Sequence, residues 1–300
     1  MRGKRSRIMI THPDKVLFPK SKISKAQMGD YYRVIAKRMI PLIKDRPISL
    51  KRFPQGIKRP GFFQKNVEKF PNFIDTTRVK KVQSTGISMV IGNKVDTLVY
   101  LANLDTIDFH IWLSKKDKPT IPDRIIFDLD PPKGRFDLAK QVAFMLKEFI
   151  EKELKLSTYV MTTGSKGLHV VIPIKREKNF DITRKFARKV ADKLAKENPK
   201  LITTQQRKQK RKNRIYIDCM RNGYAQTAIA PYSLRSIEKA PIAMPISWMD
   251  LKKISSAQVA TLNNVKTYLR KANPWHDIDR KAKSITQAEN KLAELSEHGQ

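Results

Sequence analysis

The alternation of apolar and polar residues is most regular between residues 122 and 220. Apolar positions with a period of two predict strands, and apolar positions three to four residues apart predict helices. The expected elements are a strand at 124–130, a helix at about 136–154, strands at 157–163 and 168–174, a helix opened by Asp181, and a strand at 214–220. This β-α-β-β-α-β order is typical of a ferredoxin-like or RRM-like core.

The first 120 residues predict a different mixture of elements. Ser24 and Gln27 form a capping box, and the apolar residues that follow recur at helical spacing until Pro41, where we expect the helix to stop. Residues 46–113 are typical of short strands and turns, with clear alternation at 107–113. The chain is therefore predicted to be α/β (α+β), with one domain at 1–280 and a polar tail at 281–300, which would be a marginal terminal helix or a frayed end. The domain has two lobes, at about 1–120 and 121–280.

The charge balance indicates the kind of partner. The 300 residues include 62 Lys and Arg against 28 Asp and Glu, which gives a net charge of +34. Such an excess repels itself unless a polyanion binds, and it favours nucleic acid over a membrane surface or an adaptation to an unusual cytoplasm.

Cysteine usage and hydropathy indicate the compartment. The single Cys219 excludes an intramolecular disulfide and a cysteine-based zinc site. No apolar run is long enough for a signal peptide or a membrane span. We therefore expect a cytoplasmic protein that does not act at a membrane.

A pair of carboxylates ends the strand at 124–130. The period of two places Asp128 and Asp130 on one face, and Pro131 and Pro132 end the strand immediately after them. Neighbouring carboxylates repel each other unless a cation lies between them, so the pair predicts a Mg²⁺ or Mn²⁺ site. A polar turn is the alternative interpretation. An aspartyl phosphatase also uses Asp-x-Asp, but Pro132 stands where it typically has Thr or Val.

A third carboxylate, Asp218, ends the strand at 214–220. In a β-α-β-β-α-β sheet the first and last strands can be neighbours, which would bring Asp218 to the pair. Three carboxylates can hold two divalent metals about 3.5 to 4 Å apart, an arrangement that suits phosphoryl transfer.

The turn between the two middle strands carries groups that can bind phosphate. Thr163, Ser165, Lys166 and His169 lie in or beside a turn that contains two glycines, and the spacing is not that of a Walker loop. An ordinary hairpin turn is the alternative. His110 lies on an alternating strand and could equally be a structural histidine.

Two basic regions are candidates for nucleic-acid contact. Phe62 and Phe63 stand among Arg52 and other cations, which suits base stacking, although paired aromatics are also common in cores. The basic run at 207–214, with Arg211 inside it, leads directly into the Asp218 strand. Its alternatives are a solvated loop or a localisation signal.

These motifs together resemble a known family. The chain is similar to the primase-polymerase domain of bacterial ligase D and its stand-alone archaeal relatives, in the archaeo-eukaryotic primase superfamily. The resemblance covers about residues 11–277. It rests on THPDKVLFP at 11–19, DLDP at 128–131, GSKGLH at 164–169, and Asp218 followed by Arg221 and Asn222.

The resemblance implies roles for individual residues. Asp128, Asp130 and Asp218 would be catalytic and would bind two divalent cations, Mn²⁺ or Mg²⁺. The nucleotide-binding set would be His110, Thr163, Ser165, Lys166, His169 and Arg235. The DNA-binding set would be Lys15 and Lys25 at a 5′-phosphate, Arg52, Phe62 and Phe63 at the template, and Arg211 and Arg221 near the active site.

Three positions depart from the family's pattern. Thr163 stands where Ser is common and keeps the hydroxyl. Asn213 replaces a usual Gly and can adopt a left-handed conformation at modest cost. Cys219 stands where an aromatic residue is common, and we assign it no role.

The activity implied is that of a template-dependent nucleotidyltransferase, a DNA primase-polymerase that fills gaps and extends ends in non-homologous end joining and prefers ribonucleotides. Its partners would be gapped or broken DNA with a 5′-phosphate, NTP or dNTP, and Ku. A separate ligase and phosphoesterase are expected, since no Lys-x-Asp-Gly ligase motif occurs. The protein would work at the nucleoid of a prokaryote. The rival interpretations are a de novo replicative-type primase and a non-catalytic protein that bridges DNA ends.

Overall fold

The computed structural model describes residues 7–80 and 86–297. The chain divides into two compact units, which we describe one at a time. Unit 1 contains residues 1–119, 227–244 and 260–273, and unit 2 contains residues 120–226, 245–259 and 274–300. The chain thus returns to unit 1 twice after entering unit 2, so neither unit is one continuous segment.

Unit 2 is built on a six-stranded sheet in the order β11-β12-β8-β10-β9-β14. Its strands are β8 (Arg124–Asp130), β9 (Tyr159–Thr162), β10 (Leu168–Pro173), β11 (Ile202–Thr203), β12 (Ile215–Asp218) and β14 (Pro245–Ile246). Each neighbouring pair among four of them is antiparallel, namely β12 with β8, β8 with β10, and β10 with β9. Numbered within the β-α-β-β-α-β unit, their order is 4-1-3-2, which confirms the predicted ferredoxin-like core.

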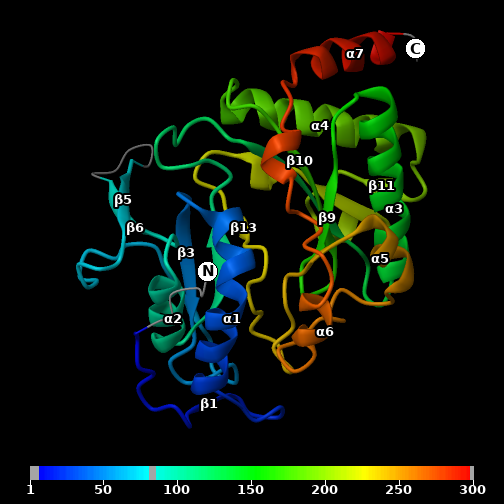
Figure 1. Cartoon of the computed structure of the whole chain (residues 1–300). Coiled ribbons are helices and arrows are strands. Elements are labelled where there is room, and N and C mark those ends of the chain that lie inside the picture. The colour runs from blue at the N-terminus through cyan, green and yellow to red at the C-terminus, as the bar shows by residue number, and fades with distance from the viewer. Residues whose placement is uncertain (1–6, 81–85, 298–300) are drawn as a thin grey trace. The chain divides into compact units, whose positions relative to one another are not determined.

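Unit 2 also contains helices and shorter helical turns. They are α3 (Phe136–Glu148), α4 (Phe180–Glu197), α5 (Trp248–Lys253) and α7 (Thr286–Glu297), with shorter turns η1 (Phe149–Glu153), η2 (Lys208–Lys210), η3 (Met220–Asn222) and η4 (Ile278–Lys281). Helices α3 and α4, which are labelled in Figure 1, both pack against β8. Ile125, Phe127 and Leu129 of β8 have no exposed surface, so the odd positions of this strand form the core.

Unit 1 holds a second six-stranded sheet, in the order β13-β7-β3-β6-β5 with β4 paired to β3. Its elements are β3 (Pro47–Arg52), β4 (Phe62–Gln64), β5 (Thr76–Val79), β6 (Ile87–Ile91), α2 (Val95–Asn103), β7 (Thr106–Ile111), β13 (Ala228–Ile229) and α6 (Val265–Leu269). A two-stranded sheet of β1 (Val16–Phe18) and β2 (Ile23–Ser24) leads into α1 (Lys25–Ile43). Helix α1 packs against α2 (Figure 1).

The capping box of α1 is confirmed, but the predicted end of the helix is wrong. The Ser24 hydroxyl accepts from the Gln27 amide, and the Gln27 side chain accepts from the Ser24 amide. Pro41 does not stop the helix, which runs on to Ile43. Pro41 lies in the last turn, where the loss of a single amide donor is tolerated because Leu42 and Ile43 are anchored in the core.

Two boundaries in unit 2 also differ from the prediction. Asn179 rather than Asp181 caps α4, because its side chain accepts from the Ile182 amide and leaves Asp181 inside the first turn. The regular part of α3 ends at Glu148 and the chain continues as one π turn. Of the two expectations for the polar segment at 281–300, the structure has the helix, α7, whose Ala288 and Leu292 are buried. Residues 298–300 of that segment lie outside the described residues.

Candidate active site

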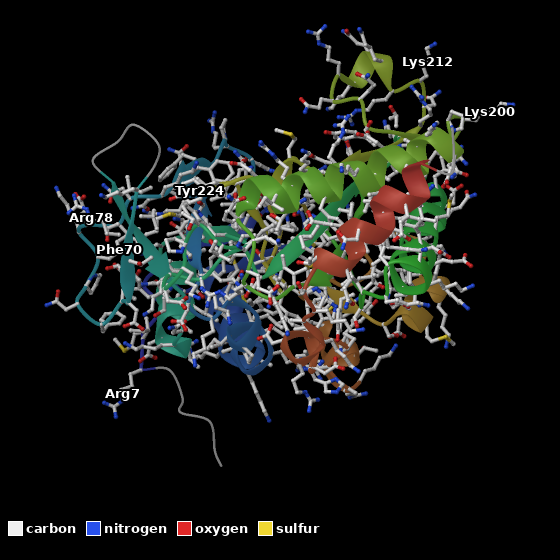
Figure 2. All side chains as sticks on the ribbon, turned by 90° about the horizontal axis from the view of Figure 1, so that it is seen from above. Arg7, Phe70, Arg78, Lys200, Lys212 and Tyr224 are labelled. Carbon is white, nitrogen blue, oxygen red and sulfur yellow. The ribbon has the colours of Figure 1, made fainter. Side chains whose placement is uncertain are left out.

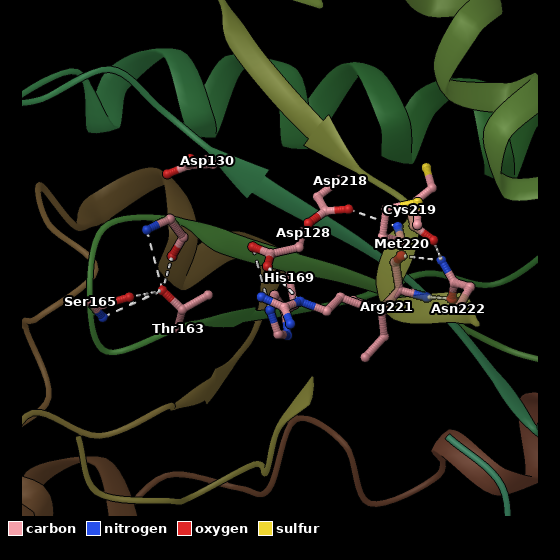
Figure 3. Close-up of polar contacts among 12 residues, drawn as sticks. Asp128, Asp130, Thr163, Ser165, His169, Asp218, Cys219, Met220, Arg221 and Asn222 are labelled. Atoms are coloured by element: carbon pink, nitrogen blue, oxygen red, sulfur yellow. Dashed lines mark hydrogen bonds and ion pairs between the residues drawn. The ribbon is translucent and has the colours of Figure 1, made fainter. Parts of the chain in front are cut away.

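The carboxylates come together in the middle of the sheet of unit 2. Asp128 of β8 lies directly opposite Asp218 of β12 on one side and directly opposite His169 of β10 on the other. Residues directly opposite each other in an antiparallel pair project from the same face. The row Asp218, Asp128 and His169 therefore crosses three neighbouring strands, and Asp130 follows two residues along β8 on the same face (Figure 3).

Cationic side chains meet two of the three carboxylates. Arg211 Nη1 lies 2.6 Å from Asp130 Oδ2, and its guanidinium stacks 4.0 Å from the centre of the Tyr216 ring. Arg221 Nε and His169 Nε2 lie 3.5 Å and 3.6 Å from the two oxygens of Asp128. Asp218 accepts the Met220 amide at 2.7 Å. Arg211, from the loop before β12, and Arg221, from η3, thus neutralise part of the charge of Asp130 and Asp128. Figure 3 shows Arg221 beside Asp128.

The ionisation of Asp128 reflects two opposed effects. Burial alone would raise its pKa, but the nearby His169 and Arg221 outweigh burial and hold the pKa of Asp128 below its usual value. Asp128 is therefore an anion at neutral pH, as a metal ligand must be.

The carboxylates fit a divalent cation by donor type and by shared face. Hard divalent cations prefer oxygen ligands, and three carboxylates on adjacent strands supply them. Over residues 7–80 and 86–297, no group of three His, Cys, Asp or Glu side chains converges closely enough to form a metal site. In this structure Arg211 and Arg221 supply positive charge next to Asp130 and Asp128. Metal binding by the three aspartates therefore stays a prediction.

The turn between β9 and β10 is built around Thr163. The Thr163 hydroxyl contacts the Ser165 hydroxyl at 3.0 Å, donates to the Gly167 carbonyl at 3.1 Å and accepts from the Gly167 amide at 3.3 Å. Gly164 has a φ of +66°. A Cβ atom on Gly167 would lie 1.8 Å from the Leu129 carbonyl oxygen. Glycine is therefore required for the turn to lie directly against the end of β8, beside Asp130.

A pocket of about 190 Å³ opens beside Asp130. Five cationic side chains line it, namely Lys133, Lys166, Lys208, Arg211 and Arg214. The loop that carries Lys212 stands out from the body of unit 2, with nitrogen-tipped side chains around it (Figure 2). This part of unit 2 concentrates positive charge next to the carboxylates, which suits a polyanionic ligand.

Asn222 is a site residue for which the sequence supplied only a family resemblance. It is 1% exposed, its side-chain oxygen accepts the Ile126 amide at 2.8 Å, and its amide group donates to the Ile126 and Cys219 carbonyls. Strand β12 ends at Asp218, so Asn222 takes over the hydrogen bonds that the strand would have made to β8. It thereby fixes the segment that carries Arg221.

His110 and Arg235 belong to unit 1. The Arg235 guanidinium lies 3.8 Å from Asp108, whose carboxylate also accepts the Ser236 amide at 2.7 Å. Asp108 and Trp112, which alternate with the same period as His110, are each 2% exposed, so this side of the segment is mostly buried. Burial raises the pKa of Asp108, and Arg235 opposes that rise. The His110 ring packs edge-on against Phe63 at 5.4 Å.

The remaining predicted DNA contacts form two groups in unit 1. Phe62 and Phe63 are 48% and 53% exposed on β4, so they are not core residues, and Arg52 stacks on the Phe62 ring at 5.5 Å. Lys15 and Lys25 both face Asp105, at 2.7 Å and 3.9 Å. Sequence analysis did not identify Asp105, because an aspartate in a turn carries no distinctive signal.

Comparison with known proteins decides the family. Residues 24–275 match the family model described as LigD, primase-polymerase domain. The chain belongs to this family. The LigD resemblance and the primase-type fold expected from the sequence are thereby confirmed.

Individual relatives of the LigD family agree with this assignment. The chain is 32% identical over 253 residues to the multifunctional non-homologous end joining protein LigD of Mycolicibacterium smegmatis, covering 82% of this chain and 32% of that protein. It is 27% identical to the bifunctional LigD of Bacillus subtilis, covering 91% of this chain and 44% of that protein. The chain thus spans less than half the length of these two relatives.

A solved structure shows the same fold. The polymerase domain from Mycobacterium tuberculosis ligase D in complex with DNA superposes with a TM-score of 0.86 at 27% identity, covering 92% of this chain and 99% of that one. Among the described residues, no helix is long and apolar enough to cross a membrane.

Proposed function

We propose that this protein is a template-dependent nucleotidyltransferase that fills gaps and extends broken DNA ends in non-homologous end joining. The observation that carries the proposal is the row of Asp128, Asp218 and His169 across three strands, with Asp130 on the same face. Membership of the LigD primase-polymerase family and the names of the relatives support it. The family's template dependence and ribonucleotide preference are part of the proposal.

Asp128, Asp130 and Asp218 would hold two divalent cations, Mn²⁺ or Mg²⁺. When bound, these cations would lower the pKa of the primer 3′-hydroxyl and neutralise the leaving pyrophosphate. Arg211 and Arg221 would then exchange the carboxylates for DNA or nucleotide phosphates. His169 would remain beside Asp128 and donate to the nucleotide.

The turn and the basic pocket next to β8 would bind the incoming nucleotide. The Ser165 and Thr163 hydroxyls and the Lys166 ammonium are suited to ribose and phosphate oxygens. The resemblance assigns His110 and Arg235 to the nucleotide as well. In unit 1, the exposed Phe62 and Phe63 would stack on template bases next to Arg52, as aromatic and cationic side chains do in single-strand binders.

Lys15 and Lys25 would bind the 5′-phosphate at the downstream edge of a gap. Gapped or broken DNA, NTP or dNTP and Ku would be the partners, and a separate ligase and phosphoesterase would complete repair. The protein would act in the cytoplasm, at the nucleoid.

Primer extension on a 5′-phosphorylated gapped duplex tests the proposal. Ribonucleotides and deoxynucleotides are compared in Mn²⁺ and in Mg²⁺, with wild type, Asp128→Ala and the control Asp137→Ala, which removes an exposed carboxylate from the same unit. Wild type and the control should extend the primer, and Asp128→Ala should not. Binding of the duplex without any extension by wild type would favour an end-bridging protein, and synthesis without a primer would favour a replicative-type primase.

A further inference from the structure

One buried carboxylate in unit 1 faces two lysines. Asp105 is 7% exposed, and its Oδ2 lies 2.7 Å from Lys15 Nζ. Its Oδ1 lies 3.9 Å from Lys25 Nζ. The two lysines differ in burial, since the Lys15 side chain is 32% exposed and the Lys25 side chain 4%. Lys15 is therefore the cation at the surface, and Asp105 and Lys25 lie beneath it.

Asp105 is held in place by the backbone. It forms the corner between α2 and β7 with a φ of +59°. Its amide donates to the Ala102 carbonyl at 2.9 Å, and its carbonyl accepts the Phe53 amide at 2.9 Å. A residue bonded on both sides in a sparsely populated conformation is fixed by its surroundings. Its carboxylate is therefore a rigid reference point for the lysines.

The same corner also fixes the buried lysine. Asn103 Oδ1 accepts the Thr11 amide at 2.9 Å and faces the Thr11 hydroxyl at 3.1 Å. That hydroxyl in turn accepts from Lys25 Nζ at 3.2 Å. The Lys25 amide donates to the Lys15 carbonyl at 2.9 Å. The backbones of both lysines are thus tied together, and the side chain of Lys15 is the part whose position depends on Asp105.

Two ammonium groups share one carboxylate in this group. Burial lowers the pKa of Lys25, Asp105 raises it again, and Lys15 and Arg52 lower it further. Without the carboxylate, the two ammonium groups would repel each other with nothing between them. With it, Lys25 offsets the charge of Asp105 and the group keeps one net positive charge, which Lys15 presents at the surface. Over the described residues, Asp105 Oδ1 accepts no hydrogen bond.

We propose that Asp105 is a positioning residue for recognition of a terminal phosphate. It holds the Lys15 ammonium at one place over the buried Lys25, and so favours a phosphate monoester over the diester phosphates of the DNA backbone. A monoester carries about −1.5 to −2 charges near neutral pH, and several of its oxygens can accept hydrogen bonds from one fixed ammonium. A freely moving lysine would instead contact any phosphate nearby. This inference rests on the proposed assignment of Lys15 and Lys25 to the 5′-phosphate.

The variant Asp105→Asn tests the proposal. It keeps the shape of the side chain, and Asn tolerates a left-handed backbone. Affinity is measured for two gapped duplexes that differ only in a 5′-phosphate or a 5′-hydroxyl at the downstream edge. The ratio of the two affinities does not depend on the fraction of folded protein, so a merely structural loss leaves it unchanged. Asp30→Asn is the matched control, because Asp30 is an exposed carboxylate of the same unit that forms a local ion pair with Arg33.

We expect Asp105→Asn to lower the ratio by at least about threefold. Its affinity for the 5′-hydroxyl duplex should not fall, because the variant gains net positive charge. Asp30→Asn should keep the wild-type ratio. An unchanged or increased ratio in Asp105→Asn overturns the inference, and an increase would mean that the carboxylate competes with the phosphate.

The variant Lys15→Ala separates this inference from the function on which it rests. If Lys15→Ala loses the preference and Asp105→Asn keeps it, the phosphate site stands and the positioning role fails. If wild type itself shows no preference, the phosphate site fails and the inference fails with it.

Discussion

The two units each bring carboxylates and cations together, in opposite proportions. In unit 2, three carboxylates share one face of the sheet, and two arginines form ion pairs with two of them. In unit 1, a single buried carboxylate lies between two lysines. A group with excess negative charge is stabilised by a bound cation, and a group with excess positive charge by a bound anion. The arrangement in unit 2 therefore suits a cation, and the arrangement in unit 1 suits an anion. Removing one carboxylate should therefore impair a different ligand in each unit, namely the divalent cation in unit 2 and the terminal phosphate in unit 1.

The largest expected effect is at the three aspartates that share one face of the sheet in unit 2. Asp128→Ala, Asp130→Ala and Asp218→Ala should each reduce nucleotide addition on the order of 10³-fold or more, because groups that stabilise developing charge dominate such reactions. DNA affinity should persist, since the basic surface is unchanged. Primer extension and anisotropy on the same preparation measure both. Extension near the wild-type rate by any one variant would contradict the metal assignment.

The contact between the turn and β8 is expected to come next. Gly167→Ala places a Cβ atom 1.8 Å from the Leu129 carbonyl oxygen, so the turn or the strand must move. Overpacking of this kind typically costs about 1 to 3 kcal/mol. We expect a lower thermal unfolding midpoint together with weaker extension. Gly223→Ala is the control, because its nearest neighbour is the Gln226 side chain at 3.2 Å, which can move. Equal stability of the two variants would show that the turn adapts.

Arg235→Ala should weaken use of the nucleotide without affecting DNA binding. The loss of a charge-assisted hydrogen bond costs about 1.5 to 3 kcal/mol, or roughly 10- to 150-fold in the concentration of nucleotide required. Lys239→Ala, an exposed cation in the same segment, carries the same change in charge and should behave as wild type. If the Arg235→Ala variant lost DNA affinity but kept the wild-type nucleotide dependence, Arg235 would be assigned to DNA binding instead.

Replacing both Lys15 and Lys25 with Ala should erase the preference for a 5′-phosphorylated gap, because no ammonium would then face the phosphate. The double variant Lys20→Ala, Lys22→Ala removes the same charge from exposed positions of the same segment and should keep the preference. The two affinities are measured by competition between phosphorylated and unphosphorylated duplexes. A preference that survives the loss of both lysines would place the phosphate site elsewhere.

The smallest expected effect concerns Cys219, next to the carboxylate row. Burial, with Asp218 as a second cause, raises the pKa of its thiol. The thiolate is the reactive form, so labelling by an aromatic disulfide at pH 8 should be at least about tenfold slower in the folded protein than after unfolding. Equal rates would mean that the segment after β12 opens readily.

The outline of unit 2 could be predicted from sequence because its determinants are local. The period of two placed Asp128 and Asp130 on one face, and the order of strands and helices predicted the neighbouring β8 and β12. The capping box of α1 depends on only two side chains and was likewise predicted. The end of that helix was not, because packing of Leu42 and Ile43 in the core outweighs the local cost of Pro41.

Other features were decided only by tertiary structure, because they join residues far apart in the chain. Asn222 completes the hydrogen bonds of β8, which lies 96 positions earlier. Asp105 meets Lys15, which lies 90 positions earlier, and Arg211 meets Asp130, which lies 81 positions earlier. No local pattern identifies such partners, since an aspartate in a turn and an arginine in a basic run have the same sequence signature whether or not they are paired. The sequence by itself determined which groups were available and on which strand face they lie, and the packing of distant segments determined which charges meet.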